Sequence, residues 1–261
     1  MSFSPTTDYE LYLRVPELLS LQKSPSERAC PDELLFQVVH QAAELWMKLV
    51  DHEMQQVGAR LSADQLADAL KTLRRIHSVL ALLGQSLETL YSLTPADYMR
   101  IREVLGRGSG QESPGFKRMM AVPGEVYPRF EALLDRRKVT LIELYRQPSL
   151  HADLFQVAEA LVDYDLRLQE WRNRHILLVY RTIGVGTPSL KGKHSELLER
   201  GLRQQFFPKL WQVRDDLYGE WSAAHPSGAG YALTGTVQPE PESPAAPPPA
   251  RAPKPPKRRA K

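Results

Sequence analysis

Phe36 and His40 lie four residues apart in a segment of helical periodicity, so their rings share one face, a turn apart. Such a pair can stack on a flat aromatic ligand while the imidazole hydrogen-bonds a ring N–H, which orients the ligand in an otherwise apolar pocket. The alternative is a histidine packed in a helical core. This segment alone favours the core histidine and leaves the ligand site open.

His175 interrupts an apolar stripe along the longest regular segment of the chain. The other members recur at steps of three and four residues: Leu154, Val157, Leu161, Tyr164, Leu168, Trp171, Leu178 and Thr182. A histidine in such a stripe is either a core residue or the axial ligand of a haem lying against the helix. No Cys-x-x-Cys-His sequence is present, so such a haem would be held non-covalently. The chain has no His-Glu-x-x-His pattern and no clustered carboxylates, which makes other metal sites weaker candidates.

Tyr98 and Arg102 form a second pair one turn apart. The planar guanidinium of Arg102 matches a carboxylate and could anchor an amino-acid substrate, or it could lie on a solvated face. Ser109 and Thr187 lie in glycine-containing loops. Their hydroxyl groups could contact a ligand there, or they could cap a turn. The sequence has no P-loop, no dinucleotide-binding glycine fingerprint and no Gly-x-Ser-x-Gly elbow.

Long helices must position these side chains, because the periodicity is helical almost throughout and no segment alternates like a strand. We therefore predict an all-α fold. The first predicted helix begins at Pro31-Asp32-Glu33 and runs to about Val57. A second begins at a capping box over Ser62–Gln65, and a third runs from Thr94 to about Gly106.

The second half of the chain continues the helical pattern. Pro123 and Pro128 predict shorter helices between Phe116 and Tyr145. The long stripe of His175 ends at the glycine- and proline-containing loop from Gly184, and a final helix contains Phe206 and Phe207.

Composition predicts one helical domain over residues 1–232 and a disordered, Pro/Ala-rich basic tail over 233–261. The tail carries about +4 of the net charge of +3, so the body is nearly neutral and a nucleic-acid-binding face is poorly supported. Cys30 is the only cysteine, which excludes an internal disulfide and agrees with a reducing compartment. With no signal peptide and no apolar run that could span a bilayer, we expect a cytoplasmic protein without a membrane partner.

Dispersed segments of the chain resemble the tryptophan 2,3-dioxygenase family of haem enzymes, in the family's order. They are Tyr9–Leu13, Asp32–Leu49, Thr94–Arg102, Leu105–Gly106 with Ser109–Gly110, Trp171–His175 and Phe207–Arg214. The resemblance implies a haem pocket between the long helices, in which His175 ligates the iron of haem b, which is Fe(II) in the active form. It also implies that His40, the catalytic residue, hydrogen-bonds the indole N–H, Phe36 lines the indole pocket and Arg102 binds the substrate carboxylate.

The same resemblance places Tyr98 and Ser109 near the substrate and the haem edge, and Thr187 near the amino-acid backbone of the substrate. Tyr9, Tyr12 and Leu13 would act in the pocket of a neighbouring subunit, in a homotetramer. The implied reaction inserts O2 across the indole C2–C3 bond of L-tryptophan and gives N-formylkynurenine, in the kynurenine pathway.

Two departures from the family keep other functions open. The stretch between Ser109 and His175 is shorter than in the family, and the loop after the long helix reads Gly186-Thr187-Pro188 with proline where the family has glycine. One alternative is a haem monooxygenase of a substituted tryptophan or a related aromatic amino acid in secondary metabolism. The other is a binding protein that holds haem or an aromatic amino acid without turnover.

Overall fold

The computed structural model describes residues 6–106, 108, 110–185 and 204–225, and every regular element in these ranges is a helix. The predicted all-α class is confirmed. The chain divides into two units, residues 1–220 and 221–261. The predicted tail and its boundary at residue 232 lie outside the described residues.

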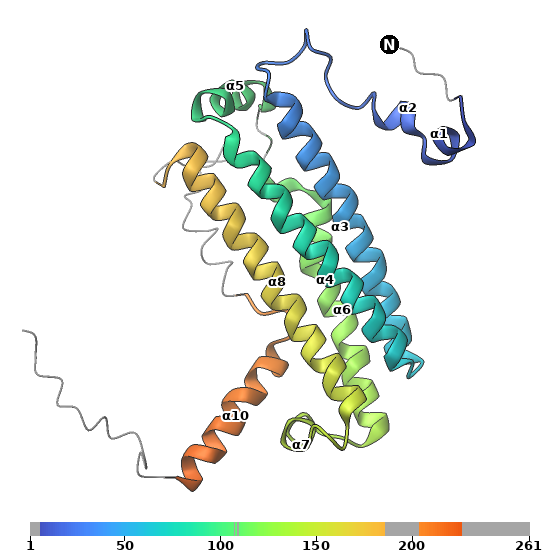
Figure 1. Ribbon diagram of the computed structural model, residues 1–261. Coiled ribbons are helices and arrows are strands. Elements are labelled where there is room, and N and C mark those ends of the chain that lie inside the picture. The colour runs from blue at the N-terminus through green and yellow to red at the C-terminus, as the bar shows by residue number, and fades with distance from the viewer. Residues whose placement is uncertain (1–5, 107, 109, 186–203, 226–261) are drawn as a thin grey trace, which may run out of the picture. The chain divides into compact units, whose positions relative to one another are not determined.

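Four long helices lie side by side in the first unit (Figure 1). They are α3 (Glu33–Ser62), α4 (Leu66–Thr89), α6 (Pro114–Arg137) and α8 (Ala152–Ile183). Helix α3 packs against α4 and α6, and α4 packs against α8. Their apolar stripes meet in one core, where each fully buried aliphatic side chain stabilises the fold by about 1.5 to 3 kcal/mol.

Short elements complete the described part of the chain: α1 (Asp8–Leu13), α2 (Val15–Leu18), η1 (Leu90–Ser92), α5 (Pro95–Leu105), η2 (Gly110–Glu112), α7 (Leu141–Arg146) and α10 (Pro208–Ala224). Helix α5 contacts α8 and lies across the end of the bundle where α3 begins and α8 ends (Figure 1). Helices α1 and α2 bury none of their residues. No helix in the described ranges is long and apolar enough to cross a membrane.

The caps of α5 agree with the prediction. The Thr94 side chain accepts a hydrogen bond from the Asp97 amide, Pro95 occupies the first turn, and Gly106 ends the helix with a φ of 63°. The predicted capping box at Ser62 is wrong. Ser62 is the last residue of α3, and its hydroxyl donates back to the Gly58 carbonyl, while Asp64 adopts a positive φ of 60° between the two helices.

The prediction of shorter helices around Pro123 and Pro128 is also wrong, since α6 continues through both prolines. Proline removes the N–H that would bond the carbonyl four residues earlier, and that carbonyl then needs another donor. For Pro123 the carbonyl is that of Met119, and the buried hydroxyl of Tyr164 donates to it at 2.9 Å. A residue of α8 therefore satisfies a group that the sequence of α6 leaves unpaired.

Asp165 of α8 fixes the start of the last helix. Its fully buried carboxylate accepts hydrogen bonds from the Phe206 and Phe207 amides and from the Trp211 indole N–H, at 2.8 to 3.2 Å. The two phenylalanines therefore precede α10 rather than lying in it, which corrects the predicted helix start.

Candidate functional site

Three helices bring the candidate site residues to one end of the bundle (Figure 1). Phe36 and His40 lie in the first turns of α3, Tyr98 and Arg102 lie in α5, and His175 lies in the last third of α8. These residues are as much as 139 positions apart in the chain. Only the packing of α5 and α8 at the start of α3 makes them neighbours.

The side chains around Phe36 are aromatic and apolar. The Phe36 ring lies 4.1 Å from the His40 ring and 6.3 Å from the Tyr98 ring, measured between centroids. Phe36 and Tyr98 pack against a small buried cluster formed by Cys30, Leu93 and Ile101. Burial raises the pKa of Tyr98, and the charge of Arg102 opposes that rise, so the phenol stays protonated beside the guanidinium.

His40 presents a defined hydrogen-bonding pattern. Its Nδ1 lies 2.7 Å from the Phe36 carbonyl oxygen, which only accepts, so Nδ1 carries the proton and Nε2 is an acceptor. The residue as a whole is exposed, yet desolvation of its ring lowers its pKa, against smaller opposing effects of that carbonyl and of Glu44. A neutral His40 is therefore the form present near pH 7.

Glu44, one turn after His40, ties the start of α6 to the site helix. Its carboxylate accepts hydrogen bonds from the Ser113 hydroxyl and, at 3.0 Å, from the Gly115 amide. Gly115 is required here, because a Cβ at that position would lie 2.7 Å from Glu44 Oε2 and from Met47 Cβ. The carboxylate thus orients α6 rather than serving as an acid or base.

His175 is half-buried, and its ring stacks on Trp171 with a centroid distance of 5.9 Å and an interplanar angle of 20°. Phe116 of α6 supports the indole from a centroid distance of 5.7 Å. Burial lowers the pKa of His175 to about 4, and the charge of a protonated His40 contributes to the shift. His175 therefore offers a neutral imidazole, the form that ligates metal ions.

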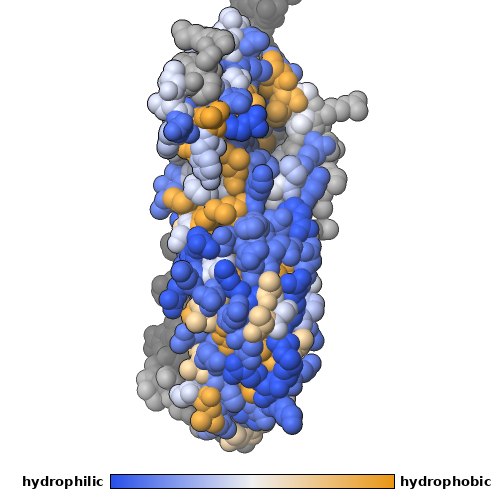
Figure 2. All heavy atoms as spheres, turned by 90° about the vertical axis from the view of Figure 1, so that its right-hand side faces the viewer, coloured by the Kyte–Doolittle hydropathy of each residue, from blue (hydrophilic) through white to orange (hydrophobic). Residues whose placement is uncertain are grey.

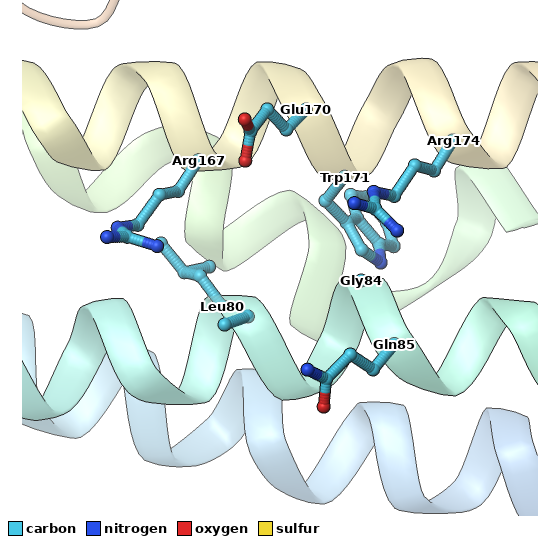
Figure 3. Close-up of a pocket in the computed structure, with 8 residues that line it drawn as sticks. Leu80, Gly84, Gln85, Arg167, Glu170, Trp171 and Arg174 are labelled. Atoms are coloured by element: carbon cyan, nitrogen blue, oxygen red, sulfur yellow. The ribbon is translucent and has the colours of Figure 1, made fainter.

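A separate hollow of about 220 Å³ lies between α4 and α8 (Figure 3). Arg167, Glu170, Trp171 and Arg174 line it from α8, and Gly84 and Gln85 line it from α4. Trp171 contributes to this hollow and also stacks on His175. Arg174 pairs with Glu88 at 2.6 Å.

The predicted site residues outside this cluster have different positions. Ser109 and Thr187 lie outside the described residues. Tyr9, Tyr12 and Leu13 of α1 are 70%, 87% and 46% exposed. Sequence reasoning missed two contributors: Cys30 belongs to the buried cluster against which Phe36 and Tyr98 pack, and Glu44 anchors the start of α6. The first has no sequence signal, whereas Glu44 falls in the His40 segment at helical spacing.

The chain is similar in sequence to known proteins. A family model described as tryptophan 2,3-dioxygenase matches residues 1–130, which include Phe36, His40, Tyr98 and Arg102. The tryptophan 2,3-dioxygenase of Bacillus thuringiensis (strain Al Hakam) is 31% identical over 267 positions, spanning 82% of this chain and 94% of that protein. The enzyme of the same name from Erythrobacter litoralis (strain HTCC2594) is 33% identical, over 79% of this chain and 97% of its own length.

A third relative, the tryptophan 2,3-dioxygenase of Caulobacter vibrioides (strain ATCC 19089 / CIP 103742 / CB 15), is 32% identical over 80% of this chain and 98% of its own length. An alignment of 267 positions that spans only 82% of a 261-residue chain contains positions without a counterpart here. The chain is thus related to these proteins over nearly their whole length, with residues deleted. On the strength of these matches, the chain belongs to the tryptophan 2,3-dioxygenase family and is an enzyme of that type.

Proposed function

We propose that this enzyme uses haem and O2 to open the indole ring of L-tryptophan, giving N-formylkynurenine in tryptophan catabolism. The observation that carries the proposal is that His40 of α3 and His175 of α8, two imidazoles whose pKa is lowered by desolvation, lie at the same end of the bundle, where α5 packs against α8. His40 lies beside aromatic and apolar side chains, and the His175 ring, stacked on Trp171, has no hydrogen bond within the described residues. This arrangement supports a substrate site beside a cofactor site.

The residues at this end fit a haem. Burial lowers the pKa of His175, so its ring is neutral near pH 7. Its ring nitrogens make no hydrogen bond with the described residues, so one of them can ligate iron. No group of three or more His, Cys, Asp and Glu residues in the described ranges could hold a metal ion by itself, and haem needs only one such ligand from the protein. Haem held by His175 supplies the activation of O2, while the protein binds and orients the substrate.

The remaining residues supply orientation and affinity. Nε2 of neutral His40 accepts the indole N–H, and Phe36 offers its ring to the flat face of the substrate. Arg102 binds the carboxylate through its planar fork. Holding the indole in one geometry beside the oxygen-activating centre replaces a bimolecular encounter with a nearly intramolecular one, so His40 acts without removing a proton.

Assembly into a homotetramer belongs to the same proposal. Helix α1 is folded but buries no residue, and it carries the exposed Tyr9, Leu11 and Tyr12. Figure 2 shows further hydrophobic surface gathered toward the upper end of the face on the α3 side, and α3 exposes Val38, Leu45 and Trp46. We propose that α1 completes the pocket of a neighbouring subunit, and a mass of four chains by light scattering is the expected result.

We place the enzyme in the cytoplasm. The single cysteine, Cys30, is free and buried, and such a thiol persists in a reducing compartment.

The test is the product mass after the haem-loaded, reduced protein reacts with L-tryptophan under ¹⁸O2. We expect a product with two labelled oxygen atoms and the mass of N-formylkynurenine. One labelled atom would instead support the second candidate, a monooxygenase of a substituted tryptophan or related aromatic amino acid. Haem binding without any product from tryptophan or its substituted forms would refute both oxygenase functions.

A further inference from the structure

Arg172 of α8 is a charged side chain with a buried nitrogen that no described residue satisfies. It is half-buried, and its Nη1 is fully buried without a hydrogen bond within the part of the chain that the structure describes. No ion pair joins it to a described carboxylate. Burial lowers its pKa, with no opposing effect from a nearby anion.

An unpaired buried guanidinium is costly, because the group loses water contacts without gaining an anion or an acceptor. Neighbouring arginines of the same helix have such partners. Arg174 pairs with Glu88 at 2.6 Å, and Arg181 donates to the Tyr91 carbonyl and lies over the Tyr91 ring. Arg172 therefore lacks the described ion-pair or hydrogen-bond partner that Arg174 and Arg181 have.

Arg167 is the other arginine of α8 with a buried nitrogen that has no partner, its Nε. It lies eight residues before His175, more than two turns away, and lines the hollow between α4 and α8 (Figure 3). Arg172 does not line that hollow and lies three residues before His175, on the adjacent turn of the same face. Arg172, with its unsatisfied Nη1, thus lies on the same face of α8 as His175.

We propose that Arg172 binds a propionate carboxylate of the haem that His175 ligates. This inference rests on the proposed haem function. Haem carries two propionates at one edge, and a carboxylate is the anion that the guanidinium fork matches with two parallel hydrogen bonds. The pairing satisfies Nη1 and cancels a charge that the apoprotein buries at a cost. Arg172 is thereby a cofactor-binding residue that sets affinity and in-plane orientation of the haem, while His175 supplies the bond to iron.

The experiment compares haem with haem dimethyl ester, in which both propionates are blocked. Apoprotein is titrated with each compound, affinity is read from the Soret band, and release is read from the rate of transfer to apomyoglobin. The wild-type protein is expected to bind haem about tenfold to a hundredfold more tightly than the ester, the range for a charge-assisted hydrogen bond. Arg172→Met should lose that preference while keeping the Soret position set by His175.

Two controls separate this effect from general damage to α8. Arg174→Met removes a neighbouring arginine that has its own partner, and should keep the full preference for haem over the ester. Arg172→Lys keeps the charge without the fork, and should retain part of the preference. Circular dichroism verifies that each variant is folded, and the wild-type comparison requires no variant at all.

Equal binding of haem and the ester by the wild-type protein would overturn the role of Arg172, as would an undiminished preference in a folded Arg172→Met variant. Either result leaves the proposed oxygenase intact, because the haem still binds. Failure of the wild-type protein to bind haem at all would refute the proposed function itself, and the inference with it.

Discussion

His40 is the residue at which orientation and proton transfer make different quantitative predictions. Its Nδ1 is engaged by the Phe36 carbonyl at 2.7 Å and its pKa is lowered by desolvation, so Nε2 of the neutral ring accepts a hydrogen bond from a neutral indole N–H. A hydrogen bond between neutral groups contributes about 0.5 to 1.5 kcal/mol. Replacing His40 with Ala should therefore lower kcat/KM for L-tryptophan by about twofold to thirteenfold.

An obligatory general base would produce a much larger effect, about 10² to 10⁴ in rate. The assay is steady-state formation of N-formylkynurenine by wild type, His40→Ala and His40→Phe, the last of which keeps an aromatic ring beside Phe36 without an acceptor. His52→Ala is the matched control, since His52 is exposed on the same helix. A thousandfold loss in a folded, haem-loaded His40→Phe variant would falsify the orienting role.

The substrate provides a second measure of the same contact. With 1-methyl-L-tryptophan there is no N–H to donate, so the wild-type enzyme should lose the hydrogen bond, whereas the His40→Ala variant has none to lose. The kcat/KM for L-tryptophan divided by the kcat/KM for 1-methyl-L-tryptophan should therefore be greater in the wild type than in the His40→Ala variant. An identical ratio in both proteins would mean that His40 does not contact the indole nitrogen.

Three further predictions concern the carboxylate, the iron ligand and the buried acid of α8. Arg102→Ala should weaken L-tryptophan binding by about tenfold to a hundredfold, the range for a hydrogen bond to a charged group, without changing tryptamine binding or the haem spectrum; equal losses for both ligands would contradict the role. His175→Ala should remove or shift the Soret band, restored by added imidazole, and an unaltered band would exclude His175 as the ligand. Burial raises the pKa of Asp165 above 3.8, so the folded state binds a proton more readily than the unfolded chain. The stability that this proton contributes is complete at low pH and is lost as the pH rises through the folded-state pKa. In urea unfolding, the stability of Asp165→Asn relative to the wild type should therefore increase with rising pH. The same pH dependence in both proteins would contradict this prediction.

The helical class and most helix ends follow from local chemistry, which explains why they were predictable. The Thr94-Pro95 start, the Gly106 end and the stripe of α8 each depend on residues within a few positions of one another. Of the three wrong boundaries, the one at Ser62 is local, whereas those at the prolines of α6 and at the start of α10 depend on distant partners. Pro123 and Pro128 remain inside α6, and for Pro123 the hydroxyl of Tyr164 satisfies the carbonyl that the proline leaves unpaired.

The residues of the candidate site show the same division. The candidate side chains could be identified from the sequence, because the spacings of Phe36 with His40 and of Tyr98 with Arg102 are helical and their segments match one family. The packing of the helices, in contrast, brings His40 and His175 to one end of the bundle and lowers the pKa of both rings. The same packing leaves Nη1 of the half-buried Arg172 without a hydrogen bond to any described residue. Burial and charge depend on what other helices place nearby, and those long-range contacts are absent from any local pattern of residues.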